Sequence, residues 1–249
     1  MTWLLDLDGV VWLADEPIPG SVGAVAALRR AGTRVVFVTN NSSTMRADYL
    51  AKLARLGMPT DSDDLITSAQ AAASLLSAGE RVLLAAGPGA REAAEQAGAV
   101  VTDDPRAAET VLVGWHRDFD FDGLTAAAQG VWAGARLVGT NDDATYPTPD
   151  GPLPGGGSIL AAIAYATGAS PTVAGKPNPP MADLINSCVD DALVFVGDRP
   201  STDGLMAQRL GVAFALVRSG VDEGATSQDV AVSWQGTDLA AAVAALHQN

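Results

Sequence analysis

Two aspartates, Asp6 and Asp8, directly follow a short apolar run near the start of the chain and precede Gly9. Residues two positions apart on an extended strand point to the same side. At the carboxyl end of a strand in an open parallel sheet, that side faces the crevice where ligands bind. Two carboxylates held together there favour binding of a cation, transfer of a proton, or both.

Three further groups of polar residues follow apolar runs that we expect to be strands. They are Thr39-Asn40-Asn41, Lys176, and the pair Asp198 and Asp203. Because the carboxyl ends of parallel strands lie along one edge of a sheet, we expect these groups to converge with the two N-terminal aspartates. Any one group alone is ordinary loop chemistry, but four such groups in one chain are harder to explain as turns.

Together these residue types suit phosphoryl transfer. Asp6, Asp8 and Asp198 supply the hard oxygen ligands that Mg²⁺ takes, and Mg²⁺ usually binds together with a phosphate. The Thr39 hydroxyl and adjacent backbone N–H groups could hold phosphate oxygens at a helix N-terminus, and Lys176 adds positive charge. The chain contains no Gly-x-x-x-x-Gly-Lys-Ser/Thr motif, so the phosphate-binding loop of nucleoside triphosphatases is not supported.

The segments that must position these residues alternate between strands and helices. Apolar runs at 3–7, 34–38 and 192–196 predict buried strands, and helical spacing at 21–31 and 45–56 predicts helices. This alternation is typical of an α/β fold with a doubly wound parallel sheet.

The α/β pattern starts afresh near residue 67, so we expect residues 67–171 to be an inserted α/β domain. Residues 1–66 and 172–249 would then form one Rossmann-like core. A loop rich in proline and glycine is predicted at 140–157. A loop of that length inside a compact domain is usually functional or a sign that its secondary structure was misassigned.

The amino-acid composition argues against several classes of binding partner. The formal net charge is −14, which argues against nucleic acid and against anionic membranes. Cys188 is the only cysteine, which excludes an intramolecular disulfide and a multi-cysteine zinc site, and we expect its side chain to be buried. Because the sequence shows no secretory signal and no transmembrane-length apolar run, we expect a cytoplasmic protein. Its oligomeric state is open, with a homodimer as one option.

The polar groups resemble, in order, the four motifs of the haloacid dehalogenase (HAD) superfamily of phosphohydrolases. The matching residues are Asp6-Leu7-Asp8-Gly9-Val10, Thr39, Lys176, and Gly197-Asp198 with Asp203. The chain is more narrowly similar to the NagD-like subgroup, whose α/β cap lies between the second and third motifs. The similar stretches are Val38 to Ser42, Gly139 to Asp143, Pro154 to Ser158 and Gly175 to Pro177. The resemblance implies a HAD-type core with residues 67–171 as the inserted cap.

The resemblance also implies roles for the acidic residues. Asp6 would be the nucleophile that forms an aspartyl-phosphate, and Asp8 would be the general acid and base. Mg²⁺ would be held by Asp6, the backbone carbonyl of Asp8, and Asp198. Asp203 would orient metal-bound water or Lys176.

The phosphate would be held by residues of the second and third motifs. By resemblance, Thr39, Asn40 and Asn41 bind the transferring phosphoryl group, and Lys176 stabilises both that group and the nucleophile. Asn141 and Asp143, at the end of a predicted cap strand, could read a substrate hydroxyl or could form a solvated turn. Both interpretations stay open.

The sequence therefore predicts a Mg²⁺-dependent phosphomonoesterase for a small phosphorylated metabolite. Sugar phosphates, glycerol phosphate, phosphoglycolate and nucleoside monophosphates all fit by resemblance, and nothing in the sequence ranks them. The first alternative is a phosphomutase with the same motifs. Product analysis would distinguish it, because a mutase returns no inorganic phosphate. A phosphate-binding protein without catalysis is the second alternative, which the intact set of acidic and basic residues disfavours.

Overall fold

The computed structural model describes residues 1–146, 151–220 and 230–247 of the chain. Their contacts divide the chain into two compact units, each with its own main sheet. Unit 1 comprises Met1–Thr39, Ala47–Ile66 and Ala182–Asn249, and unit 2 comprises Asn40–Arg46 and Thr67–Met181.

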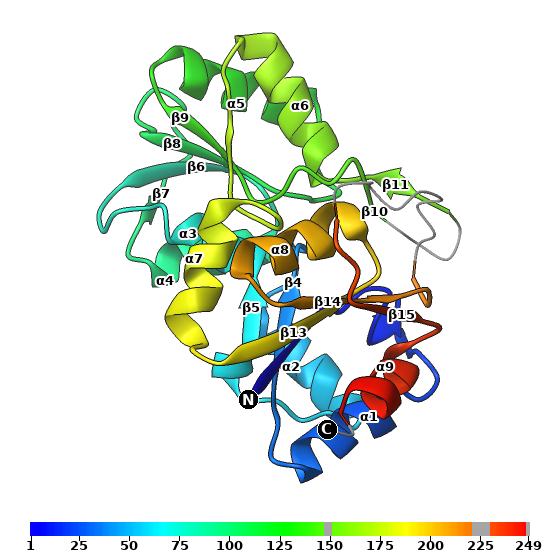
Figure 1. Cartoon of the computed structure of the whole chain (residues 1–249). Coiled ribbons are helices and arrows are strands. Elements are labelled where there is room, and N and C mark those ends of the chain that lie inside the picture. The colour runs from blue at the N-terminus through cyan, green and yellow to red at the C-terminus, as the bar shows by residue number, and fades with distance from the viewer. Residues whose placement is uncertain (147–150, 221–229, 248–249) are drawn as a thin grey trace. The chain divides into compact units, whose positions relative to one another are not determined.

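Unit 1 contains a six-stranded sheet with the order β15-β14-β13-β1-β4-β5 (Figure 1). The strands are β1 (Thr2–Leu5), β4 (Arg34–Thr39), β5 (Leu65–Thr67), β13 (Ala192–Gly197), β14 (Ala213–Val217) and β15 (Trp234–Gly236). β1 pairs in parallel with β13 on one side and with β4 on the other. The strand order therefore reverses at β1, and ligands bind outside the carboxyl ends of the strands at such a point.

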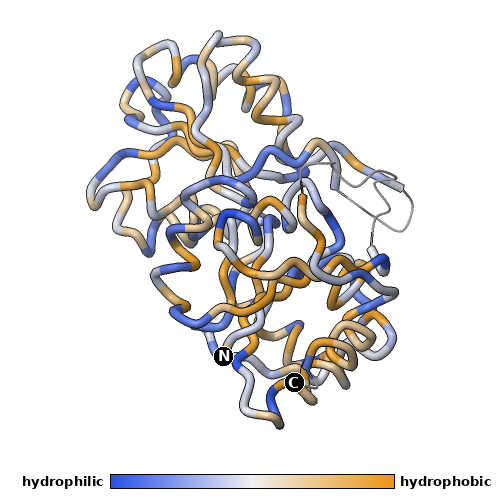
Figure 2. Tube along the Cα trace, viewed as in Figure 1, coloured by the Kyte–Doolittle hydropathy of each residue, from blue (hydrophilic) through white to orange (hydrophobic). Residues whose placement is uncertain are grey.

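The core of unit 1 surrounds β1, whose four residues are all buried. Trp3 and Leu5 of this strand belong to one cluster with Phe37 of β4 and Val196 of β13. Figure 2 shows the hydrophobic residues along these strands. Burial of each such side chain is worth about 1.5–3 kcal/mol, so the strand that leads to Asp6 is firmly anchored.

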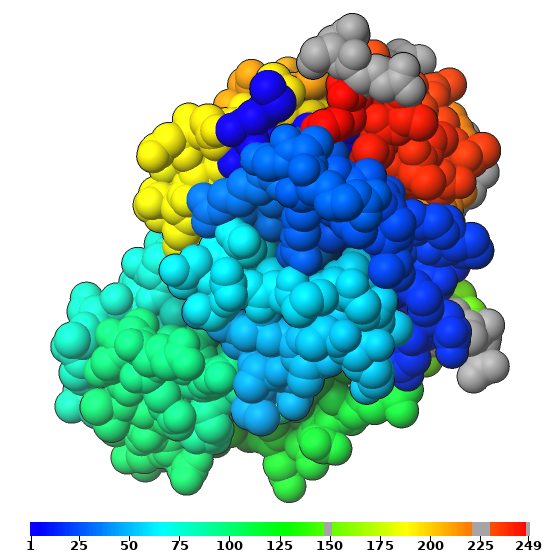
Figure 3. Space-filling model, turned by 90° about the horizontal axis from the view of Figure 1, so that it is seen from below, coloured from blue at the N-terminus to red at the C-terminus, as the bar shows by residue number. Residues whose placement is uncertain are grey.

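Helices and short turns connect the strands of unit 1. They are β2 (Trp12–Leu13) and β3 (Glu16–Pro17), which form a hairpin, α1 (Ser21–Arg30), α2 (Arg46–Arg55), the 3-10 helix η1 (Ser62–Asp64), α7 (Pro179–Cys188), the π-helix η2 (Pro200–Gly204), α8 (Leu205–Leu210) and α9 (Leu239–Leu246). Although α1 and α9 are far apart in the sequence, they lie side by side, as Figure 1 and Figure 3 both show. Leu28 of α1 and Leu239 of α9 are fully buried in the same core cluster.

Unit 2 is built on a five-stranded sheet with the order β12-β9-β8-β6-β7, in which every pairing is parallel. The strands are β6 (Arg81–Ala85), β7 (Val100–Val101), β8 (Thr110–Val113), β9 (Arg136–Gly139) and β12 (Thr172–Val173). The remaining elements are α3 (Ser68–Ala73), α4 (Pro88–Gln96), α5 (Phe121–Trp132), the β10 (Thr145–Tyr146) and β11 (Leu153–Pro154) hairpin, and α6 (Gly156–Thr167). Leu83, Val111 and Ile163 are central to its core.

Within the described residues, every helix of the chain is too short or too polar to cross a bilayer.

The predicted α/β class with a parallel sheet is confirmed, but several local expectations are not. Residues 172–173 pair with β9 in the sheet of unit 2 rather than joining the sheet of unit 1, because Val173 packs on the core that α6 and β9 share. The loop expected around residues 10–19 contains the β2–β3 hairpin. The loop expected at 140–157 contains the β10–β11 hairpin, and its residues 147–150 lie outside the described residues.

Cys188 is exposed, although we expected its side chain to be buried. The buried positions of α7 and the residue after it are Met181, Ala182, Ile185 and Val189. These positions follow the helical repeat, and Cys188, the last residue of α7, lies at the flank of this buried face, where it is exposed.

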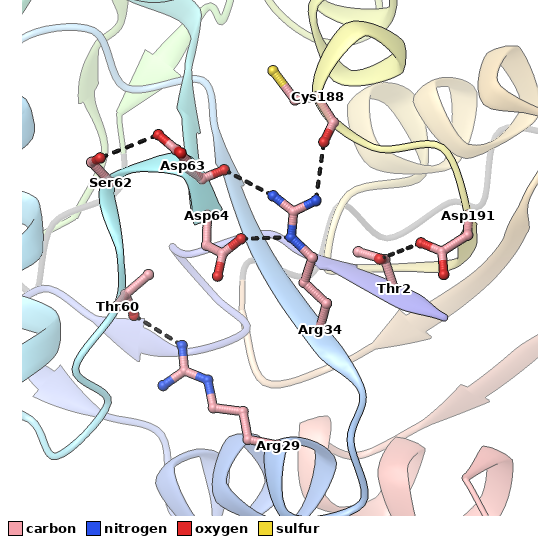
Figure 4. Close-up of polar contacts among 9 residues, drawn as sticks. All are labelled: Thr2, Arg29, Arg34, Thr60, Ser62, Asp63, Asp64, Cys188 and Asp191. Atoms are coloured by element: carbon pink, nitrogen blue, oxygen red, sulfur yellow. Dashed lines mark hydrogen bonds and ion pairs between the residues drawn. The ribbon is translucent and has the colours of Figure 1, made fainter.

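Arg34 at the start of β4 ties two other segments of unit 1 to the sheet (Figure 4). Its Nε donates to Asp64 Oδ1 at 2.7 Å, and its Nη2 donates to the carbonyl of Asp63 at 3.2 Å. Its Nη1 donates to the carbonyl of Cys188 at 3.0 Å. One guanidinium therefore satisfies backbone and side-chain acceptors from η1 and from the end of α7.

We expect Arg34→Ala to lower the free energy of unfolding by about 1–2 kcal/mol, because these hydrogen bonds are lost together. Urea unfolding followed by circular dichroism measures the change. Arg30→Ala is the matched control, since Arg30 is an exposed residue of α1 and its loss should change stability by less than about 0.5 kcal/mol. Equal stability of the two variants would show that Arg34 does not tie these segments together.

Glu80 holds the starts of three strands of unit 2 together. Its carboxylate accepts hydrogen bonds from Thr110 Oγ1 at 2.5 Å, Arg136 Nη2 at 2.8 Å and the Ser77 amide at 2.8 Å. Burial alone would raise the pKa of Glu80, but these hydrogen bonds outweigh it and hold the pKa below the ordinary value of 4.5.

A carboxyl group whose pKa is lower in the folded state stabilises the fold at neutral pH, and this contribution is lost as pH falls through the folded-state pKa. We therefore expect the urea midpoint of the wild type to fall as pH is lowered below 4.5. The decline should be shallower in Glu80→Gln. Glu95→Gln, which alters an exposed glutamate of α4, should keep the wild-type slope, and an identical slope in Glu80→Gln would contradict the assignment.

Candidate metal centre and phosphate-binding residues

Three carboxylates meet at the carboxyl edge of the unit 1 sheet. Oxygen atoms of Asp6, Asp198 and Asp203 all lie within 4.8 Å of one another. The three residues are only 7%, 5% and 1% exposed, in that order. The sequence predicted that these aspartates would converge, and the structure brings all three together.

The sheet itself places two of these residues. The amide of Asp6 donates to the carbonyl of Val196 at 2.9 Å, which continues the pairing of β1 with β13 for one more residue. Asp6 and Asp198 therefore follow the ends of two neighbouring strands, at the same edge of the sheet. Asp203 comes from η2, where its Oδ2 accepts the Arg199 amide at 3.1 Å.

Two glycines allow the backbone to approach the Asp198 carboxylate. A Cβ on Gly9 would lie 2.3 Å from Asp198 Oδ2, and a Cβ on Gly220 would lie 1.9 Å from the same atom. Gly9 also has a φ of +85°, which side-chain-bearing residues rarely adopt. Ser219 Oγ donates to the carbonyl of Gly9 at 2.7 Å and closes this cradle.

The three carboxylates fit a divalent cation such as Mg²⁺. All the donors are hard oxygen atoms, which suit this ion. Like charges held this close in a buried site repel one another, and a bound cation offsets that repulsion. The cradle of Gly9 and Gly220 fixes one of the three donors in place, so the structure supports a metal site here.

Asp8 and Thr39 come from two neighbouring strand ends, since Asp8 follows Asp6 by two residues and Thr39 ends β4. Thr39 ends β4 and is 1% exposed, on the strand next to β1. Among the described residues, the candidate metal cluster includes the Asp203 carboxylate but not that of Asp8. Asp8 Oδ1 instead accepts a hydrogen bond from Trp12 Nε1 at 3.1 Å.

The other predicted site residues lie in unit 2, where Asn40 is the centre of a hydrogen-bond network. Asn40 Nδ2 donates to Asp143 Oδ2 at 3.2 Å and to the carbonyl of Lys176 at 3.1 Å. Asn40 Oδ1 accepts the Lys176 amide at 2.7 Å. The carbonyl of Asn40 accepts from Asn141 Nδ2 at 2.7 Å and from Ser68 Oγ at 2.5 Å. The network therefore fixes Asn40 relative to Asp143, Asn141 and the backbone of Lys176.

Asn41 fixes the turn that follows. Its Oδ1 accepts from the Ser43 amide at 3.0 Å and from Ser43 Oγ at 2.9 Å, and its Nδ2 lies 3.5 Å from Tyr146 Oη.

Lys176 is 2% exposed, which is rare for a lysine. Asn40, Asn41, Lys176, Asn141 and Asp143 therefore all belong to unit 2.

Three features of these sites were not predicted from the sequence. They are the indole contact of Trp12 with Asp8, the backbone cradle that includes Gly220, and the side-chain bonds of Asn40 within unit 2. Only the close spacing of Asp8, Gly9 and Trp12 in the sequence could have suggested a turn that brings Trp12 back. The Asn40 and Gly220 contacts join residues that are distant in the sequence.

Comparisons with known proteins agree with this geometry. Residues 3–100 match the family described as haloacid dehalogenase-like hydrolase. Residues 173–246 match a second family, described as HAD-hydrolase-like. The two matched ranges contain the three carboxylates, Asp8, Thr39 and Lys176.

The similar proteins include curated enzymes. D-glycerol 3-phosphate phosphatase of Mycobacterium tuberculosis is 37% identical over 228 residues, 88% of this chain and 63% of that protein, so this chain spans about 63% of that relative's length. Dihydroxyacetone phosphatase of Corynebacterium glutamicum is 34% identical over 90% of this chain and 83% of that protein. The crystal structure of a glycerol phosphate phosphatase from Mycobacterium tuberculosis in complex with magnesium has a TM-score of 0.88 and 33% identity, covering 96% of this chain and 74% of that one.

We expect Gly9→Ala to weaken Mg²⁺ binding by about 10- to 100-fold, because the new Cβ displaces the Asp198 carboxylate. Isothermal titration with Mg²⁺ measures the affinity. Gly32→Ala is the matched control, because Gly32 also has a positive φ of +78° but a Cβ there would have open space around it. Both variants should lose about 1 kcal/mol of stability or more from backbone strain, whereas only Gly9→Ala should lose metal affinity. A Gly9→Ala protein with wild-type affinity would contradict the cradle.

Proposed function

The chain belongs to the haloacid dehalogenase-like hydrolases, among the NagD-like phosphatases, and we propose that it hydrolyses a small phosphate monoester through a covalent intermediate on Asp6. The observation that carries this proposal is the buried cluster of Asp6, Asp198 and Asp203 at the sheet edge. Asp8 stands two residues after the proposed nucleophile, where an acid and base would serve the same phosphate.

The proposed reaction has two steps. In the first, a carboxylate oxygen of Asp6 forms a bond to phosphorus while the bond from phosphorus to the ester oxygen breaks. Asp8 gives its proton to that oxygen, and the alcohol leaves. In the second, Asp8 takes a proton from water as the water oxygen bonds to phosphorus and the bond to Asp6 breaks. Inorganic phosphate is released, and both aspartates return to their starting states.

Mg²⁺ is the proposed cofactor, held by Asp6, Asp198 and the backbone carbonyl of Asp8, with Asp203 supporting the site. When bound, the ion supplies positive charge that offsets the carboxylates and the incoming phosphate dianion. Support comes from the all-oxygen donor set and its cradle, and from the structurally similar glycerol phosphate phosphatase in complex with magnesium.

We assign phosphate binding to Thr39, Asn40, Asn41 and Lys176. Thr39 ends the strand next to β1 and offers a hydroxyl. The side chain of Asn40 is already engaged within unit 2, so its backbone N–H is the group we assign to the phosphoryl oxygens. The buried Lys176 ammonium would balance negative charge in the transition state.

The proposed substrate is a small phosphorylated metabolite. The similar enzymes named above take their names from glycerol 3-phosphate and dihydroxyacetone, and another similar protein is an acid sugar phosphatase of Staphylococcus haemolyticus. We propose that residues 67–171 act as a cap that excludes water, with Asn141 and Asp143 contributing to specificity. The single cysteine is consistent with a cytoplasmic location.

We expect Asp6→Asn to lower Mg²⁺-dependent phosphate release from p-nitrophenyl phosphate by roughly 10³-fold or more, because an amide cannot replace the carboxylate nucleophile. Asp183→Asn is the matched control, since Asp183 is an exposed aspartate of α7, and it should retain wild-type turnover. Circular dichroism of each variant checks that the fold is retained. Near-native turnover by folded Asp6→Asn would refute the nucleophile, and full wild-type turnover in excess chelator would remove the metal from the mechanism.

A further inference from the structure

The turn after β1 brings the ring of Trp12 back to Asp8. The carbonyl of Leu7 accepts hydrogen bonds from the amides of Val11 at 2.9 Å and Trp12 at 3.2 Å. The Gly9 amide donates to the carbonyl of Trp12 at 2.8 Å, which closes the turn. As a result, the indole Nε1 of Trp12 lies 3.1 Å from Asp8 Oδ1 and donates a hydrogen bond to it.

The Trp12 ring is held in place from the side of α2. Trp12 is 1% exposed, and its ring stacks on Tyr49 with 6.3 Å between ring centroids and 9° between the planes. Lys52 Nζ lies 4.2 Å from the centroid of the same ring. Stacking and a cation–π contact each favour one ring position, so the direction of the indole N–H is fixed.

This fixed donor distinguishes the two oxygens of Asp8. An indole N–H can donate a hydrogen bond but cannot accept one. When Asp8 is protonated, the carbonyl oxygen is the better acceptor, so this N–H favours the carbonyl form at the oxygen that faces Trp12 and the proton on the other oxygen. When Asp8 is ionised, the same N–H stabilises the carboxylate.

We propose that Trp12 is a positioning residue for the general acid and base, and that its indole N–H directs the transferable proton of Asp8 to the oxygen remote from the indole ring. The inference rests on the proposed function, because it concerns the step in which Asp8 protonates the leaving oxygen. In that step the proton leaves the remote oxygen of Asp8, the electron pair of the breaking phosphorus–oxygen bond stays on the ester oxygen, and Asp8 becomes a carboxylate.

The kinetic test compares substrates whose leaving groups differ in their need for a proton. An alkyl ester such as glycerol phosphate needs protonation of its leaving oxygen, whereas the p-nitrophenolate of p-nitrophenyl phosphate leaves without it. For Trp12→Phe, we expect kcat/KM to fall about 10- to 100-fold on the alkyl ester and less than about threefold on the aryl ester, which does not need the acid. Equal losses on both esters, or no loss on either, would overturn the proposal.

Trp3→Phe is the matched control. Trp3 is also 1% exposed and lies in the same core cluster, and its indole Nε1 is buried without a hydrogen-bond partner among the described residues. Because this substitution also removes a buried indole, it should reproduce any general loss of packing. We expect its ratio of aryl to alkyl kcat/KM to equal that of the wild type, and a shifted ratio would show that the effect of Trp12→Phe is merely structural.

A spectroscopic test does not depend on how Trp12→Phe folds. The indole N–H proton of Trp12 should resonate downfield in a ¹H–¹⁵N spectrum of the wild type and move upfield in Asp8→Ala, while the Trp3 indole signal stays in place. An unmoved Trp12 signal would overturn the proposal.

The same samples separate this inference from the proposed function. Wild-type protein that releases no phosphate from either ester with Mg²⁺ would refute the proposed function, whatever the spectra show. An active wild type with an impaired Asp8→Ala variant supports the proposed function, and the inference about Trp12 then fails on its own if Trp12→Phe loses activity equally on both esters.

Discussion

The repulsion among three buried carboxylates is the constraint on which this molecule depends. Asp6, Asp198 and Asp203 place oxygens within 4.8 Å of one another with almost no access to solvent, and such an arrangement is unfavourable without positive charge. The fold maintains it by anchoring β1 in the middle of the sheet, where its neighbours β13 and β4 leave little freedom at the strand ends. A bound divalent cation would offset this repulsion, which is why we assign the proposed Mg²⁺ to these three carboxylates.

The other residues that we assign to the site fall into two sets, one in each unit. In unit 1, Gly9 and Gly220 let the backbone reach Asp198, while Trp12 donates a hydrogen bond to Asp8. In unit 2, Asn40 connects the segment after β4 with Asp143 and the backbone of Lys176. Unit 1 thus holds the acids that we assign to the chemistry together with Thr39, and unit 2 holds the asparagines and the lysine that we assign to phosphate and substrate.

The sequence predicted the parts of this arrangement that follow from short-range pattern. Apolar runs identified the strands, and the acids that follow them identified the edge, because parallel strands end on one side of a sheet. The prediction that Thr172–Val173 joins the core sheet was wrong, since so short a segment has no periodicity of its own and its pairing with β9 depends on long-range packing. The side-chain bonds of Asn40 were missed for the same reason.

Chemical trapping shows whether Asp6 forms a bond to phosphorus during turnover. Protein that is turning over substrate with Mg²⁺ is quenched in acid, reduced with borohydride and digested, and the peptide that contains Asp6 is sequenced by mass spectrometry. Reduction of an aspartyl-phosphate converts the residue to homoserine, so a covalent intermediate on Asp6 should give homoserine at position 6 and nowhere else. Conversion of another residue, or active enzyme with no conversion at all, would contradict it.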